Sequence, residues 1–319
     1  MFKLTLYDRK IIYELDKQSN LRLSELAKRI QRSKPFILYR MKRLEQEGVI
    51  TGYNAIIDMA KLGYFSFRIY LKMRQMTDAE GHALVEFIKK NCPQVWTITS
   101  MHEKWDYALF LGVKTMMEFH QIWDRILLEY KAKIKNYNVA VYAPIYNFNR
   151  RFFLETKEQR IVRTYGEGTL QTIDARDWQI IQEYAPSVRK SSLEIGKKLG
   201  VTADTVRNRI KKLEKNKVIC GYKLGLDLST LGYLSYRIDL ELLSTKENNR
   251  LFEYCKQHNN IYQINQSIGG ANFEMEVIVK DQPELLSILD QLKIEFKGVV
   301  DDIEYFSFST FHILNYIPD

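Results

Sequence analysis

The first 54 residues carry apolar side chains at helical spacing. They recur every three or four residues in three consecutive segments, as Ile37, Met41 and Leu44 do in the third. Ser33 is a favourable N-cap for that third helix, and Gly48 follows it as a stop signal. A short apolar run comes directly after the glycine and has the character of a strand. The order helix, helix, turn, helix and strand predicts a winged helix-turn-helix unit.

The next hundred residues alternate between the period of a strand and the period of a helix. Residues 64–73 place an apolar side chain at every odd-numbered position, which predicts a half-buried strand. The predicted elements that follow are a helix at 78–91, strands at 94–101 and 105–113, a helix at 116–130 and a strand at 134–146. This βαββαβ order is that of a ferredoxin-like domain.

The chain repeats itself after 169 residues. The shift aligns Arg40-Met-Lys-Arg-Leu-Glu with Arg209-Ile-Lys-Lys-Leu-Glu, and 22 of the 64 positions from residue 8 to 71 are identical. The second copy has the same three helical segments, followed by the same alternation. Its predicted strands and helices lie at 233–242, 246–258, 261–268, 272–279, 283–296 and 299–314. The sequence therefore predicts two copies of one α+β unit.

These patterns divide the chain into five parts. We expect winged helix-turn-helix units at 1–54 and 173–223, ferredoxin-like domains at 55–150 and 224–319, and a linker at 151–172.

Charge is unevenly distributed over these parts. The whole chain has a formal charge of +9, with 45% hydrophobic and 27% charged residues, which excludes long disorder. Each helical unit holds 12 Lys/Arg against 6 Asp/Glu, a net charge of +6, whereas residues 224–319 have a net charge of −8. Basic helices are typical of a phosphate-binding surface. Three scattered cysteines and the lack of a long apolar run favour a cytoplasmic protein without a membrane segment.

The helical segments resemble a known family. The run Asp8-Arg-Lys-Ile-Ile, followed by Leu23-Ser-Glu-Leu-Ala-Lys-Arg and the Arg40 hexapeptide, is similar to the opening of Lrp/AsnC transcription regulators. The resemblance implies a DNA-binding regulator whose ferredoxin-like domains sense an effector and mediate dimerisation. Relatives usually carry one copy and form dimers, so the fusion predicts an intramolecular pseudo-dimer. Whether that chain forms a further homo-oligomer stays open.

The third helix of each copy is the expected reader of the major groove of double-stranded DNA. Arg makes bidentate hydrogen bonds to guanine and Asn makes them to adenine, while Lys mostly contacts phosphate. The predicted DNA-binding residues are the outward-facing ones, Lys34, Tyr39, Arg40, Lys42 and Arg43 in the first copy and Thr205, Arg207, Asn208, Arg209, Lys211 and Lys212 in the second.

The resemblance also implies a small-molecule effector, such as an amino acid. In the family its site tends to lie at the turn between the second and third strands of the ferredoxin-like domain, with a glycine turn near an Asp. The second copy partly matches with Gly269, Gly270 and Asn272, and the first copy keeps only Asp106. These four are the candidate effector-binding residues.

The sequence shows no catalytic motif. The five histidines have no metal-ligand spacing, and no P-loop, dinucleotide fingerprint or nucleophile elbow is present. We therefore expect no enzyme, no metal and no cofactor. Siroheme decarboxylases resemble the same architecture and bind a tetrapyrrole between ferredoxin-like domains, but the His-Asn-Tyr-type run of their second strand is absent at 95–102 and 261–268. A scaffold that binds only protein is a third alternative.

Overall fold

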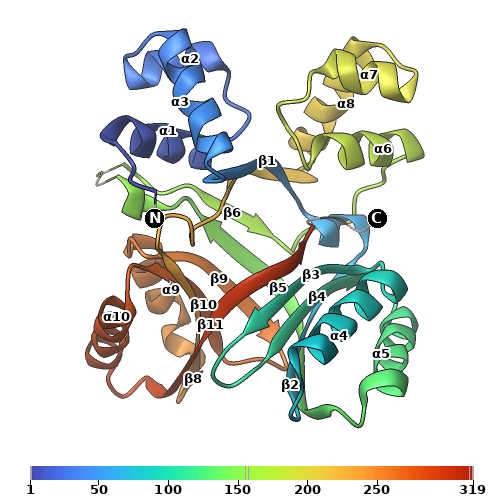
Figure 1. The fold of residues 1–319 in the computed structure, drawn as a ribbon, viewed down its shortest axis with the longest axis vertical. Coiled ribbons are helices and arrows are strands. Elements are labelled where there is room, and N and C mark those ends of the chain that lie inside the picture. Colours follow the sequence, from blue (N-terminus) through green and yellow to red (C-terminus); the bar gives the residue numbers. More distant parts are fainter. Residues whose placement is uncertain (1, 155, 157, 316, 318–319) are drawn as a thin grey trace.

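Two layers make up the protein (Figure 1). The computed structural model describes residues 2–154, 156, 158–315 and 317. The upper layer consists of two three-helix units, and the lower layer of strands with helices around them. The first unit contains α1 (Leu6–Lys17), α2 (Leu23–Ile30) and α3 (Lys34–Gln46), and the second contains α6 (Ala175–Tyr184), α7 (Ser192–Leu199) and α8 (Ala203–Lys215).

Local signals place these helices where the sequence predicts them. The Ser33 side chain caps α3, and Thr202 caps α8 in the same way, since each hydroxyl accepts a hydrogen bond from a backbone N–H of the first turn. Ile37, Met41 and Leu44 are buried in the core of the upper layer. The helix-turn-helix prediction is confirmed in both copies.

The strand that follows each unit does not form a separate wing. β1 (Ile50–Ile57) pairs antiparallel with β7 (Ile219–Leu226), so the two strands form one ribbon shared by both copies. Tyr53 lies opposite Leu224 and Ala55 lies opposite Tyr222. The ribbon therefore joins the two helical units below their helices.

The lower layer contains two ferredoxin-like domains, as predicted. The first has β2 (Phe65–Met73), α4 (Asp78–Asn91), β3 (Val95–Met101), β4 (Tyr107–Val113), α5 (Met116–Tyr130) and β5 (Ile134–Phe148). The second has β8 (Leu234–Leu242), α9 (Asn248–Gln257), β9 (Ile261–Ile268), β10 (Phe273–Val279), α10 (Gln282–Glu295) and β11 (Val300–Leu314).

The strands of the two domains close into a barrel. Their order is β2-β4-β3-β11-β8-β10-β9-β5, and β5 also pairs with β2, so eight antiparallel strands form a ring. The pairs β3–β11 and β5–β9 join the two copies. The four helices α4, α5, α9 and α10 lie outside the barrel (Figure 1). One face of each sheet is thus covered by helices, while the other faces the barrel interior.

The segment predicted as a linker contains a strand of its own. β6 (Val162–Tyr165) pairs with β5 beyond the ring, after a short 3-10 turn at Arg151–Phe153. The buried Arg163 side chain donates hydrogen bonds to main-chain carbonyls at the end of α1. The joint is therefore packed against both layers. Among the helices that the structure describes, none is both long and apolar enough to cross a membrane.

Candidate functional site

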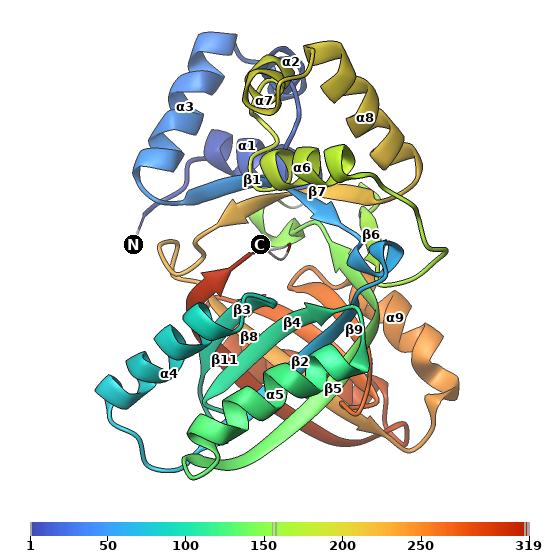
Figure 2. The same ribbon diagram turned by 90° about the vertical axis from the view of Figure 1, so that its right-hand side faces the viewer.

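The helices α3 and α8 lie at the end of the molecule opposite the barrel, on either side of α2 and α7 (Figure 2). Most of the predicted DNA-binding side chains on them are exposed. These are Lys34, Tyr39, Lys42 and Arg43 on α3 and Arg207, Asn208, Lys211 and Lys212 on α8, while Thr205 is half-buried. Both helices thus present basic and hydrogen-bonding groups to solvent.

Arg40 and Arg209 are held inside their own units instead. The Arg40 Nε lies 2.8 Å from Oδ1 of the buried Asp8. In the second copy the Arg209 Nη1 lies 2.7 Å from Oδ1 of the buried Asp177. Burial alone would raise the pKa of Asp8, but hydrogen bonds from Arg40 and Thr5 outweigh it and lower that pKa. These two arginines therefore fasten the third helix to the first, and their guanidinium groups are engaged within the protein.

A second contact repeats in both copies and connects the ribbon to the third helix. The Tyr53 hydroxyl on β1 donates a 2.5 Å hydrogen bond to Glu45 near the end of α3. Tyr222 on β7 donates in the same way to Glu214 on α8. Burial is the main cause of the raised pKa of Tyr53. The hydroxyl therefore stays protonated and can donate this hydrogen bond. The ribbon therefore contacts both third helices through the same tyrosine–glutamate pair.

The two turns predicted to bind an effector are filled by the protein's own groups. Asp106 accepts hydrogen bonds from the Lys72 ammonium at 2.8 Å and from the Met73 amide at 2.6 Å. The Asn272 side chain accepts one from the Leu242 amide at 2.8 Å.

The glycine turn packs against a buried carboxylate. A Cβ atom on Gly270 would lie 2.1 Å from Glu274 Oε1, and the Gly269 carbonyl accepts a hydrogen bond from Asn138 at 2.9 Å. The glycines are needed for close packing. None of the four predicted effector residues lines the cavity described next.

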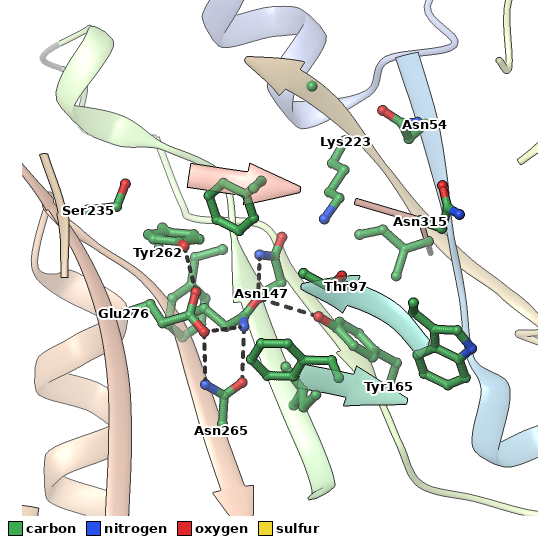
Figure 3. A pocket seen from close by; sticks show the side chains of 18 of the residues that line it. Asn54, Thr97, Asn147, Tyr165, Lys223, Ser235, Tyr262, Asn265, Glu276 and Asn315 are labelled. Carbon is green, nitrogen blue, oxygen red and sulfur yellow. Dashed lines mark hydrogen bonds between the residues drawn. The ribbon is translucent and has the colours of Figure 1, made fainter. Parts of the chain in front are cut away.

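A cavity of about 520 Å³ lies between the β1–β7 ribbon and the near end of the barrel (Figure 3). The ribbon contributes Asn54 and Lys223 from above, and Glu276 lies on the barrel side. We call this space the central cavity. Its aromatic lining residues are Phe67, Trp96, Phe110, Tyr142, Phe148, Tyr165, Tyr262, Phe308 and Phe311.

A hydrogen-bond network fixes the Glu276 carboxylate at the cavity (Figure 3). Tyr262 donates to it at 2.5 Å, Gln263 at 3.0 Å and Asn265 at 3.2 Å. The Gln263 carbonyl oxygen in turn accepts from Asn147 at 3.2 Å. Sequence reasoning missed these residues, although polar residues alternate with apolar ones in both β9 and β10.

Glu276 also belongs to a set of buried charges inside the barrel, together with Arg68, Arg237, Asp239 and Glu274, and its Oε1 lies 3.4 Å from Arg237 Nη1. Arg68 Nη1 lies 2.9 Å from Glu274 Oε1, and Arg237 also bonds Glu274. The Arg237 Nε lies 2.8 Å from Asp239. Burial alone would raise the pKa of Glu274, but the two arginines outweigh it and lower that pKa. We call this set the charge layer.

A solved structure of an enzyme shares this architecture. The siroheme decarboxylase NirDL has a TM-score of 0.66 and 15% sequence identity, covering 98% of this chain and 95% of that one. A structure of NirDL with an iron-uroporphyrin III analogue matches with a TM-score of 0.65. The expectation of no enzyme is therefore wrong, because it relied on missing motifs, whereas an enzyme is built on the same two-copy fold.

Sequence comparison points to regulators. Residues 4–51 match the family model for winged helix-turn-helix DNA-binding domains. An uncharacterised HTH-type transcriptional regulator of Pyrococcus abyssi is 32% identical over 124 residues, which are 38% of this chain and 80% of that protein. The HTH-type transcriptional regulator LrpB of Bacillus subtilis is 29% identical over 120 residues, again 38% of this chain and 80% of the relative. With two copies of this unit in sequence, the chain belongs to the Lrp/AsnC family of transcription regulators.

Proposed function

We propose that this protein is a sequence-specific DNA-binding regulator that contacts one duplex with both copies of an intramolecular pseudo-dimer. The observation that carries the proposal is the pair of exposed basic helices, α3 and α8, at one end of the molecule. The β1–β7 ribbon joins their units within one chain. Phosphate contacts supply affinity, while base contacts from the two third helices supply specificity.

The two third helices would read different bases. Tyr39 and Asn208 occupy the same register of the repeat, and so do Lys42 and Lys211. Asn hydrogen-bonds adenine in the major groove, whereas Tyr lacks that paired donor and acceptor. We therefore expect two half-sites of different sequence.

Selection of bound sequences from random duplexes at two salt concentrations tests this proposal. We expect a preferred duplex whose affinity falls steeply with salt. Lys42→Ala and Lys211→Ala should each weaken binding, whereas Lys280→Ala, which removes an exposed lysine of the barrel layer, should not. A protein that binds no duplex at low salt would contradict the proposal.

A tetrapyrrole enzyme is the second candidate function, because the NirDL architecture covers nearly the whole chain. Siroheme carries several carboxylates and needs cationic partners. Within the described residues, the charged side chains lining the central cavity are Asp16, Arg150, Lys223 and Glu276, and Arg150 is bound to Asp16 at 2.6 Å. This donor set fits a polycarboxylate poorly, so we place the regulator first. Incubation of the purified chain with siroheme, followed by absorbance and carbon dioxide release, tests the enzyme.

A small-molecule effector such as an amino acid, and a further homo-oligomer, remain part of the proposal on family grounds alone. The contacts at Asp106 and at the Gly269–Gly270 turn leave these residues engaged within the protein. An effector that binds at these residues would have to replace contacts that they now make within the protein.

A further inference from the structure

We infer that the central cavity is a ligand site for a small molecule with a planar aromatic ring and an alkyl ammonium group that contacts Glu276. The binding site depends on the cavity alone. Its regulatory consequence rests on the proposed DNA-binding function.

The shape and lining of the cavity suit an aromatic molecule. Its volume of about 520 Å³ lies within the range of small-molecule sites, which are mostly apolar with a few fixed polar groups. Trp96, Phe110 and Phe308 contribute ring surfaces from three different strands. Rings stack on such surfaces and gain about 0.5–1.5 kcal/mol beyond their buried area. A flat conjugated ligand therefore matches these walls better than an aliphatic one.

The Glu276 carboxylate is prepared to accept a donor from the ligand. Its Oε1 accepts from Gln263 and Asn265 and also lies 3.4 Å from Nη1 of the buried Arg237, and its Oε2 accepts from Tyr262. A carboxylate oxygen has two acceptor sites, so Oε2 can take a second hydrogen bond. Because these partners already orient the carboxylate, it needs little reorganisation when a ligand binds. An ionised donor forms a stronger hydrogen bond with a carboxylate than a neutral donor does.

The charged side chains that line the cavity balance in number among the described residues, so their positions decide which end of a ligand each would face. In the described part of the chain, the cavity is lined by two carboxylates and two cations, and Arg150 is already committed to Asp16. Lys223 enters from the ribbon side, opposite Glu276 (Figure 3). The ammonium group of the ligand would thus face the barrel.

Occupancy of the cavity would act on DNA binding through the ribbon. The cavity is covered by β1 and β7 residues, and these strands bond the third helices through Tyr53–Glu45 and Tyr222–Glu214. A ligand that contacts both ribbon and barrel changes how the ribbon sits and hence the relative placement of α3 and α8. A ligand shifts such an equilibrium only by its differential affinity for the two arrangements.

The test is calorimetric binding of two indole probes to the full-length chain without DNA. Tryptamine carries an ammonium group, and indole-3-acetate carries a carboxylate on the same ring. We expect tryptamine to bind and indole-3-acetate to bind at least about tenfold more weakly, as expected for one charge-assisted hydrogen bond. Glu276→Gln should weaken tryptamine binding by a similar factor.

Two further variants keep the result interpretable. Asp239→Asn removes a carboxylate of the same charge layer that does not line the cavity, so it should bind tryptamine like the parent. Phe311→Ala changes a 49% exposed lining residue and tests the aromatic wall should Glu276→Gln fail to fold. It should weaken both probes alike.

Equal binding of both probes, no binding of tryptamine, or full binding by folded Glu276→Gln would each overturn the site. DNA affinity is measured separately, with and without tryptamine. Tryptamine binding that leaves DNA affinity unchanged would overturn only the regulatory consequence. Loss of DNA binding in the ligand-free chain would instead count against the proposed function.

Discussion

The two copies share the ion pair between their first and third helices and differ inside the barrel. Asp8 binds Arg40 in the first copy, and Asp177 binds Arg209 in the second, at positions separated by the same 169 residues. Each of these contacts lies within one copy. Both partners of each ion pair come from the same copy, and both copies have the pair.

The charge layer shows what happens where the copies meet. Arg68 and Arg237 correspond, yet Phe110 lies opposite Arg68 while Glu276 lies opposite Arg237. By the same registers Ala108 corresponds to Glu274, so the carboxylate that binds both arginines comes from the second copy alone. Two first copies paired together would bury two arginines without it. The barrel interior therefore favours pairing of unlike copies.

The largest effect should follow removal of that shared carboxylate. Glu274→Ala leaves two buried guanidinium groups without their partner, and we expect the free energy of unfolding to fall by about 3–5 kcal/mol. Urea denaturation at neutral pH measures it. Glu304→Ala, at an exposed pair with Lys104, is the matched control and should cost below about 1 kcal/mol. Equal losses in the two variants would show that the charge layer does not hold the barrel together.

The sequence predicted the helices and strands well because their signals are local. The β5 strand, for example, begins at Ile134 as expected. It ends at Phe148, slightly after the predicted end at residue 146. Closure of the barrel and the shared ribbon could not be predicted, since strand pairing between copies depends on contacts far apart in sequence. The same holds for Arg40. Its position on the outward face of the third helix could be predicted, but its ion pair with Asp8 of the first helix could not.

The two helix-to-helix ion pairs should differ in strength. The Arg40 side chain is 12% exposed and that of Arg209 is 28% exposed, and Lys212 lies 3.6 Å from Asp177 as a substitute cation. We expect Arg40→Ala to cost about 2–3 kcal/mol of unfolding free energy and Arg209→Ala about 1 kcal/mol less. Parallel urea denaturation of the two variants measures the difference. The reverse order would contradict the role of exposure and of Lys212.

A third contact exists in the first copy only and depends on pH. The buried Asp16 binds Arg150 of the joint at 2.6 Å, and the second copy has Ala185 at that position. Burial alone would raise the pKa of Asp16, but Arg150 lowers it. Asp16→Ala should cost about 2 kcal/mol at neutral pH.

The sign of its pH dependence follows from the lowered pKa. The folded-state carboxyl keeps its charge to lower pH than the unfolded one, so its contribution is complete above the ordinary aspartate value and is lost as pH falls through the folded-state value. The stability difference between the parent and Asp16→Ala should therefore shrink below a pH of about 4. A difference that stays constant from neutral pH to pH 3 would mean that the ion pair contributes nothing.

The smallest effect is expected for base recognition, from a substitution that makes the two third helices more alike. Tyr39 is 63% exposed on α3, and Asn208 is exposed at the matching position of α8. Because neither side chain supports the core, Tyr39→Asn should leave stability unchanged and give both helices the same adenine-reading group. We expect selected duplexes to gain an adenine in the first half-site and to become more symmetric, with a preference of about 1 kcal/mol over other bases at that position. Asn208→Ala is the converse change and should relax the second half-site alone. Identical selected sequences for the parent and both variants would place base reading outside this register, and would leave Arg43 and Arg207 as the exposed arginines of the third helices to examine.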